Sequence, residues 1–202
     1  MPRHARSLFL CTLLAAGGCR LGQAEPVALH GPAPRSVVVW PRLPEAFADV
    51  EQSLLAGLDI ALRRRGYDVH SVAVGRQLLL EADLLTLEPE LARVSALLAV
   101  DAVLQLDVGE FTASSDGLLQ RARWDLGWRL LSTRGEGELW HYSHHGTWQR
   151  RELDTGDPLR RFDEEPDIVP IGGRGAPNFR DVVDLAAWLH RFALERLPRS
   201  DR

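Results

Sequence analysis

Three histidines within one short stretch form the strongest candidate for metal chemistry in this chain of 202 residues. They are His141, His144 and His145, inside a segment, 138–149, whose alternating pattern predicts a strand. Neighbouring side chains of a strand point to opposite faces, so His141 and His145 share a face but lie about 13 Å apart, at roughly 3.3 Å per residue. One zinc ion, with ligand bonds of about 2.1 Å, cannot bridge that gap. We therefore expect polar residues of a half-exposed strand here, and a metal site only if a bulge at Gly146 redirects them.

Four tryptophans lie on the same strand and on the predicted strand before it, 120–130. In that earlier strand, apolar residues alternate strictly with charged residues and glycine, which predicts one buried face. The four residues are Trp124, Trp128, Trp140 and Trp148. Aromatic stripes of this kind are typical of a core beneath a helix, and we expect that arrangement. The alternative is an open aromatic face, which would offer a platform for a sugar or a peptide.

No other pattern points to catalysis. The glycine-rich stretch 172–175 lacks the Gly-Lys-Ser/Thr ending of a phosphate-binding loop, and the chain contains no Gly-x-Ser-x-Gly nucleophile elbow. Alternation along a strand places Asp107 and Glu110 on opposite faces, which leaves a glycosidase-like carboxylate pair without support. The arginines 63–65 end a predicted helix, where cations suit the helix dipole, so a solvated helix end is favoured over a phosphate site. We expect no catalytic residue, no cofactor and no enzyme activity.

The first residues have the pattern of an export signal that ends in a cysteine. Arg3 and Arg6 precede a short apolar run, which is too short to span a bilayer, and then the sequence Leu14-Ala-Ala-Gly-Gly-Cys19 follows. Small residues directly before Cys19 resemble the lipobox of bacterial lipoproteins. This resemblance implies removal of residues 1–18 and lipid on the thiol and the new amino group of Cys19, with several acyl chains as a stable membrane anchor. The alternative is an ordinary secretory signal with an incidental cysteine. In lipoproteins of enteric bacteria, an Asp directly after the lipidated cysteine keeps the protein in the inner membrane. This chain has Arg20 at that position, so the resemblance implies the periplasmic face of the outer membrane.

Charge and cysteine content narrow the set of partners. The chain has 24 basic residues, all Arg, and 28 acidic residues, which gives a net charge of −4. Loss of residues 1–18 removes two arginines and makes the net charge −6. A net negative charge disfavours the binding of nucleic acid or anionic lipid, so we expect neither as the main ligand. Cys11 leaves with the signal and Cys19 carries lipid, so we expect no disulfide in the mature chain.

The remaining chain predicts a flexible tether, 19–35, and a single domain, 36–202. The fold class is α/β (α+β), with a mixed sheet of about five strands, first strand–helix–strand–helix–strand and then an antiparallel meander, plus a C-terminal helix. We predict strands at 36–40, 67–73, 101–111, 120–130 and 138–149, and helices at 45–65, 74–85, 86–99 and after Asn178. A long acidic loop, 150–177, lies inside the domain and is mobile or functional by its length.

The order of these signals carries a family resemblance. A Val-rich strand ends in Pro41, a long helix ends in Arg65-Gly-Tyr, Asp101-Ala-Val-Leu opens a strand, and Gly137-Glu-Leu-Trp closes a hairpin, all after Cys19. Over residues 36–148 this resembles a family of small bacterial outer-membrane lipoproteins whose fold is like the N-terminal domain of TolB. LpoB and the periplasmic domain of CsgG share that broad architecture.

The resemblance implies a non-enzymatic role in the cell envelope, in which the protein assembles, recruits or regulates other envelope proteins. The membrane and those proteins are then its partners. The acidic loop departs from the family pattern. The alternative is a lipoprotein that binds peptidoglycan or another glycan, or a metal-dependent hydrolase, that uses the strand at 140–148.

Overall fold

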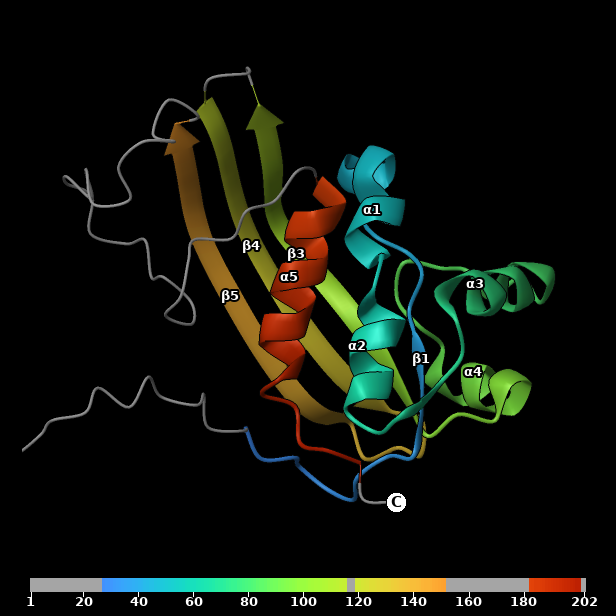
Figure 1. Ribbon diagram of the computed structural model, residues 1–202. Coiled ribbons are helices and arrows are strands. Elements are labelled where there is room, and N and C mark those ends of the chain that lie inside the picture. Colours follow the sequence, from blue (N-terminus) through green and yellow to red (C-terminus); the bar gives the residue numbers. More distant parts are fainter. Residues whose placement is uncertain (1–26, 116–118, 152–181, 201–202) are drawn as a thin grey trace, which may run out of the picture.

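A mixed five-stranded sheet forms the centre of the domain in the computed structural model, which describes residues 27–115, 119–151 and 182–200 (Figure 1). The strand order is β2-β1-β3-β4-β5, with β1 parallel to β2 and β3, and β3, β4 and β5 antiparallel. The bounds are β1 Ser36–Val39, β2 Asp68–Val69, β3 Ala102–Ser115, β4 Leu119–Ser132 and β5 Glu138–Arg151. The predicted fold class and C-terminal helix are confirmed.

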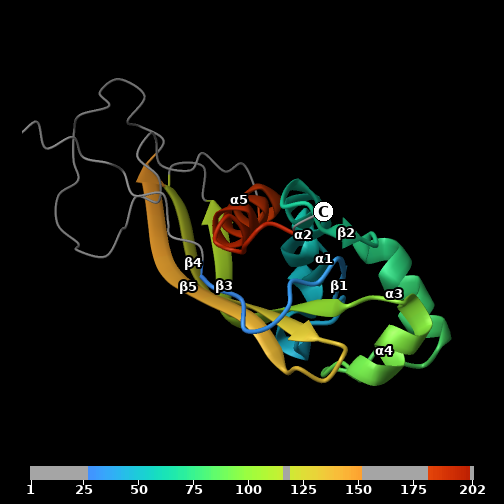
Figure 2. The same cartoon turned by 90° about the horizontal axis from the view of Figure 1, so that it is seen from below.

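Helices cover both faces of this sheet at its β1 end, because β1 and the first half of β3 are apolar on both faces. The helices are the 3-10 helix η1 Glu45–Val50, α1 Glu51–Leu55, α2 Leu58–Arg64, α3 Val72–Glu81, α4 Leu91–Leu98 and α5 Val182–Leu194. Figure 2 shows α1, α2 and α5 on one face of the sheet and α3 with α4 on the other. The two faces accordingly have separate hydrophobic cores, one with Val37 and Val39 and the other with Val38 and Val103.

The single helix predicted over 45–65 is wrong, since η1, α1 and α2 divide that stretch. Ala56 is extended, with φ −62° and ψ 131°, and Gly57 has φ +81°, a left-handed conformation that glycine adopts without strain. This break ends α1 before α2 begins, and α2 then contacts β1. The predicted helix at 86–99 also begins later, at Leu91, because Pro89 disfavours helical geometry in the residue before it.

The segment 27–35 lies along the domain. The Val27 N–H donates to the Arg196 carbonyl at 3.0 Å, and the His30 N–H donates to the Leu139 carbonyl at 2.8 Å. The Arg35 N–H donates to the Asp101 carboxylate at 2.9 Å. Residues 27–35 of the predicted tether are therefore part of the domain. Residues 19–26 are outside the described residues, as are residues 152–177 of the acidic loop and the predicted cap Asn178.

None of the helices in the described ranges is long and apolar enough to cross a membrane.

Candidate functional site

Strands β4 and β5 bring most of the candidate residues together, because their register places the tryptophans on the face toward α5. Trp128 pairs with Tyr142, and Trp124 pairs with Gly146. Trp124, Trp128 and Trp140 are buried, with 6%, 0% and 0% of their surface exposed, so these three belong to the core and the predicted packing is confirmed for them. The open aromatic platform is therefore wrong for these three residues. The side chain of Trp148 is outside what the structure describes.

A buried histidine that the sequence analysis did not single out lies against this tryptophan row. His190 of α5 accepts a hydrogen bond at Nδ1 from the indole N–H of Trp128, at 3.1 Å. Its Nε2 then carries the proton and donates to the Leu54 carbonyl of α1. Burial lowers the pKa of His190 to about 4, so the ring is neutral at pH 7. The period of the α5 stripe, in which Ala186 and His190 are four residues apart, was the signal that could have found it.

His144 of β5 also accepts a hydrogen bond from a tryptophan indole. The indole N–H of Trp124 donates to Nδ1 of His144 at 2.8 Å, and the two rings stack with centroids 5.9 Å apart. Burial lowers the pKa of His144, and the charges of His145 and Arg196 add to this effect. The Nδ1 lone pair is thus occupied, which leaves only Nε2 for any ligand.

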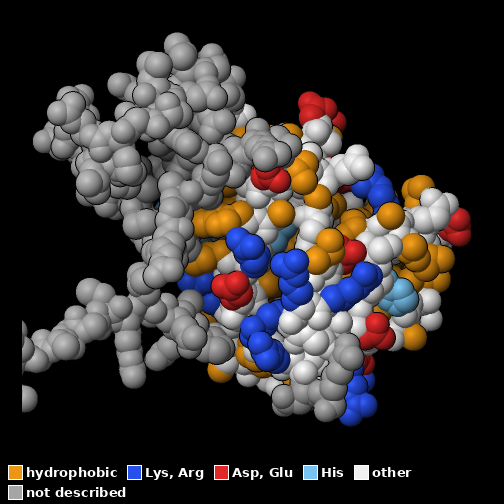
Figure 3. All heavy atoms as spheres, viewed as in Figure 1, with side chains coloured by type: hydrophobic (Ala, Val, Ile, Leu, Met, Phe, Trp, Pro, Cys, Tyr) orange, Lys and Arg blue, Asp and Glu red, His pale blue; other side chains and the backbone are white. Residues whose placement is uncertain are grey.

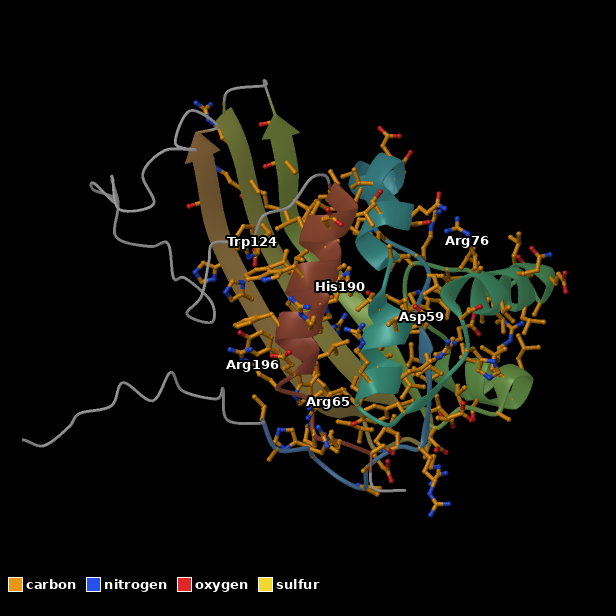
Figure 4. The ribbon with its side chains drawn as sticks, in the orientation of Figure 1. Asp59, Arg65, Arg76, Trp124, His190 and Arg196 are labelled. Carbon is orange, nitrogen blue, oxygen red and sulfur yellow. The ribbon has the colours of Figure 1, made fainter. Side chains whose placement is uncertain are left out.

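A half-buried aromatic cluster continues from His144 toward the C-terminal end of α5. Tyr142 and His144 of β5 contact Phe192 of α5, and Phe192 stacks on Trp188. The guanidinium of Arg196 lies 3.7 Å from the Phe192 ring centroid and 4.8 Å from that of Tyr142 (labelled in Figure 4). Burial raises the pKa of Tyr142, an effect that Arg196 partly offsets. Arg196 therefore closes this end of the cluster as a cation–π contact.

The other two histidines lie on the opposite, outer face of the sheet. His141 pairs with Arg129 and His145 pairs with Asp125, and both histidines are exposed. Gly146 stays in register with Trp124, so the bulge that a metal site required is not at this position; the irregularity of β5 falls at Leu139 instead. Across the described ranges, no group of three or more His, Cys, Asp or Glu side chains is placed to hold a metal ion.

A bulge at Gly109 overturns the expected separation of two carboxylates. The register of β3 shifts between Val108 and Glu110, so that Asp107 faces Gly127 and Glu110 faces Asp125. Asp107 and Glu110 therefore share the outer face, whereas simple alternation placed them on opposite faces. Asp107 forms an ion pair with Arg129, with the Nε of Arg129 2.6 Å from a carboxylate oxygen. This ion pair neutralises one of the two carboxylates.

Two of the three arginines at the end of α2 form contacts within the fold. Arg63 donates to the Val69 carbonyl at 2.8 Å and lies 3.8 Å from the Asp59 carboxylate. Arg65 donates to the Leu197 carbonyl and so ties α2 to the segment after α5. These contacts give two of the three arginines a structural role without a bound phosphate.

Comparisons with known proteins give structural likeness only. No protein-family model and no curated protein matches this chain. Among solved structures, it is similar to the lipoprotein GNA1162 from Neisseria meningitidis, with 22% identity over 62% of this chain and 90% of that chain, and a TM-score of 0.49. It is also similar to PelC from Paraburkholderia phytofirmans, crystallised as a dodecamer, with 17% identity over 84% and 94% of the two chains and a TM-score of 0.44.

The C-terminal domain of LpoB from Escherichia coli is a further similar structure, with 17% identity over 57% of this chain and 84% of that chain, and a TM-score of 0.30. The structures that this chain resembles thus include bacterial lipoproteins. These identities and TM-scores are too low to assign the chain to the family of any of them.

Proposed function

We propose that this chain is a lipid-anchored protein at the periplasmic face of the outer membrane, and that it acts without catalysis as a scaffold, adaptor or regulator of an envelope protein assembly. The observation that carries the proposal is the run Leu14-Ala-Ala-Gly-Gly-Cys19 behind a basic and then apolar leader. Lipid on Cys19 fixes the location of the protein, and the folded domain then acts through contacts.

The outer face of β3, β4 and β5 is the surface that we assign to those contacts. On the inner face of the sheet, α5 packs against the tryptophan row. On the outer face, the side chains of β3, β4 and β5 that α4 does not cover are exposed. Exposed members include Glu110, Thr112, Arg121, Arg123, Asp125 and His145. A sheet face with both signs of charge suits a protein partner of complementary charge, because such pairs set specificity and association rate.

Several of the candidate catalytic side chains already bond to other residues of the domain, which also supports a role through protein contacts. His144 is bonded to Trp124, Asp107 is paired with Arg129, and Asp101 receives the N–H groups of Arg35 and Ser36. The glycan-binding or hydrolase alternative draws less support, because Trp124, Trp128 and Trp140 are buried, and no group of three or more His, Cys, Asp or Glu side chains in the described ranges is placed to hold a metal ion.

Co-purification from solubilised envelopes tests the proposal. The lipidated protein should retain at least one stoichiometric envelope protein, and the variant Arg121→Glu/Arg123→Glu should lose it while keeping its melting temperature. The control Arg42→Glu/Arg93→Glu makes the same change of charge at exposed positions outside the β3–β5 meander, and it should retain the partner. A wild-type protein that copurifies with no stoichiometric partner, or equal loss in both variants, would contradict the proposed docking face.

A further inference from the structure

Arginines gather where α2 and α5 end, in a chain whose overall charge is negative. Segments 58–68 and 191–200 contain six arginines and three carboxylates. The arginines, which we call the basic face, are Arg63, Arg64, Arg65, Arg191, Arg196 and Arg199; the carboxylates are Asp59, Asp68 and Glu195. The two helices contact each other, and Figure 3 shows the basic side chains clustered on the exposed side of this helix layer. The local net charge is positive although the chain carries −4.

Most of this positive charge is available to a ligand. Arg64, Arg191 and Arg199 are exposed, and none of them forms an ion pair with another residue in the described ranges. Arg65 and Arg196 donate to the carbonyls of Leu197 and Phe192, which are neutral, so both guanidinium groups keep their net charge. Arg63 shares its charge with Asp59, yet half of its side chain is exposed.

The described chain begins at this same place. The Val27 N–H donates to the carbonyl of Arg196 at 3.0 Å, so the segment that comes from Cys19 reaches the domain at the basic face. Eight peptide links separate Cys19 from Val27, and at up to about 3.6 Å per residue they span at most about 29 Å. An anchor at Cys19 therefore confines this corner of the domain to a thin layer at the membrane surface.

We propose that the basic face binds the anionic phospholipid headgroups of the membrane that holds the lipid anchor. The inference rests on the proposed anchoring at Cys19 for its geometry, and on charge complementarity for its chemistry. Clusters of arginines close to an anchor supply the second, electrostatic signal that strengthens membrane attachment. The outer face of β3–β5 lies on the side of the sheet away from α2 and α5, as Figure 2 shows, so it would point toward the periplasm and its proteins.

The net negative charge of the chain led to the expectation that anionic lipid is not its main ligand. The distribution of charge along the fold alters that expectation, because screening limits an exposed charge to a range of about 8 Å at physiological salt. The acidic residues elsewhere in the chain then contribute little at the basic face. The structural alternative is that these arginines only stabilise the negative ends of the α2 and α5 dipoles. That role affects unfolding but gives no binding to lipid.

Vesicle cosedimentation of the mature chain, residues 19–202 with Cys19→Ala, separates these readings. Because this protein carries no lipid, its binding reports on the basic face whatever the outcome for Cys19. It should bind vesicles made of equal parts phosphatidylglycerol and phosphatidylcholine, bind pure phosphatidylcholine much more weakly, and dissociate as salt is raised. Arg64→Gln/Arg191→Gln should lower the partition coefficient by about fivefold per arginine.

The matched control is Arg121→Gln/Arg123→Gln, which removes the same charge from exposed positions of β4 on the outer face. Its partition coefficient should stay within twofold of the parent. Failure of the parent to bind the mixed vesicles, or equal loss of binding in both double variants, overturns the proposal and leaves a basic face for an acidic protein. Mass spectrometry of the native N-terminus tests the anchor separately, so the two failures are distinguishable.

Discussion

The indole of Trp128 and the imidazole of His190 share a hydrogen bond in a fully buried position, which connects β4 to α5. The second nitrogen of His190 reaches the Leu54 carbonyl, so one neutral ring joins the sheet and two helices. Both polar atoms of the ring are satisfied only in the tautomer with the proton on Nε2. A second proton on Nδ1 would meet the Trp128 N–H, a donor, and would break this connection.

Protonation of His190 should therefore make stability depend on pH. Its pKa is lowered to about 4 by burial, against about 6.5 in an unfolded chain. Between these two pKa values the unfolded state binds more protons than the folded state. The contribution of His190 to the free energy of unfolding is therefore complete above pH 6.5, and it decreases by on the order of 3 kcal/mol as the pH falls toward 4. Urea unfolding at several pH values measures this slope. His190→Gln keeps an acceptor and a donor but does not titrate, and its curve should be flatter over this interval; equal slopes in both proteins would refute the assignment.

The contact between Trp124 and Gly146 predicts a strict requirement for glycine. A Cβ added at Gly146 would lie 2.6 Å from Cζ2 of Trp124, on a rigid ring that packs in the core. Gly146→Ala should lower the free energy of unfolding by about 1–3 kcal/mol through overpacking. Gly127→Ala is the control within the same sheet, because its nearest added contact is 3.4 Å. Denaturant melts should show little change for the control, and similar losses in the two variants would contradict this account.

Much of the fold follows from local sequence patterns, because period-two alternation extends over many residues of β4 and over most of β3 and β5. The parallel pairing of β1 with β2 and the antiparallel meander of β3, β4 and β5 were predicted correctly, whereas the position of β1 between β2 and β3 was not predicted. The break at Ala56-Gly57 was not, since the apolar stripe continues through it and a single glycine in a helical pattern is only a weak signal. Alternation also failed at Gly109, where one extra residue reverses the faces that follow.

The site was harder to predict than the fold, because its contacts are made between elements. The burial of Trp124 and Trp128 followed from the pattern of β4, but their partners His144 and His190 depend on how β5 and α5 lie across them. The basic face likewise has no sequence motif. It arises because the ends of α2 and α5, about 130 residues apart in sequence, come together in space.

The buried carboxylate of Glu51 predicts an asymmetric response to substitution. Glu51 accepts the Leu43 N–H at 3.0 Å and forms an ion pair with Arg76, whose side chain is 43% exposed. Arg76→Met leaves this carboxylate without its cation and should cost about 1–3 kcal/mol, below the cost of breaking a fully buried pair because water reaches Arg76. Adding Glu51→Gln, which keeps an acceptor for Leu43, should restore part of the loss. Thermal melts of the two single variants and the double variant give the coupling energy, and simple additivity would count against the pair.

The location of the protein should depend on one sulfur atom. Cys19→Ala removes the lipidation site but no residue of the described domain, which begins at Val27. In a wash at high salt, which screens the contact between the basic face and anionic headgroups, the protein should therefore leave the membrane fraction, or remain there only through an uncleaved leader, while the unfolding of its domain is unchanged. Mass spectrometry of the wild-type N-terminus should find Cys19 as the first residue, with the mass of its acyl chains. A conservative Arg20→Gln variant should still be acylated, because the modification takes place at the cysteine. An unmodified Cys19 in the wild-type protein would instead support the ordinary secretory signal, and the domain would then reach its partners without an anchor.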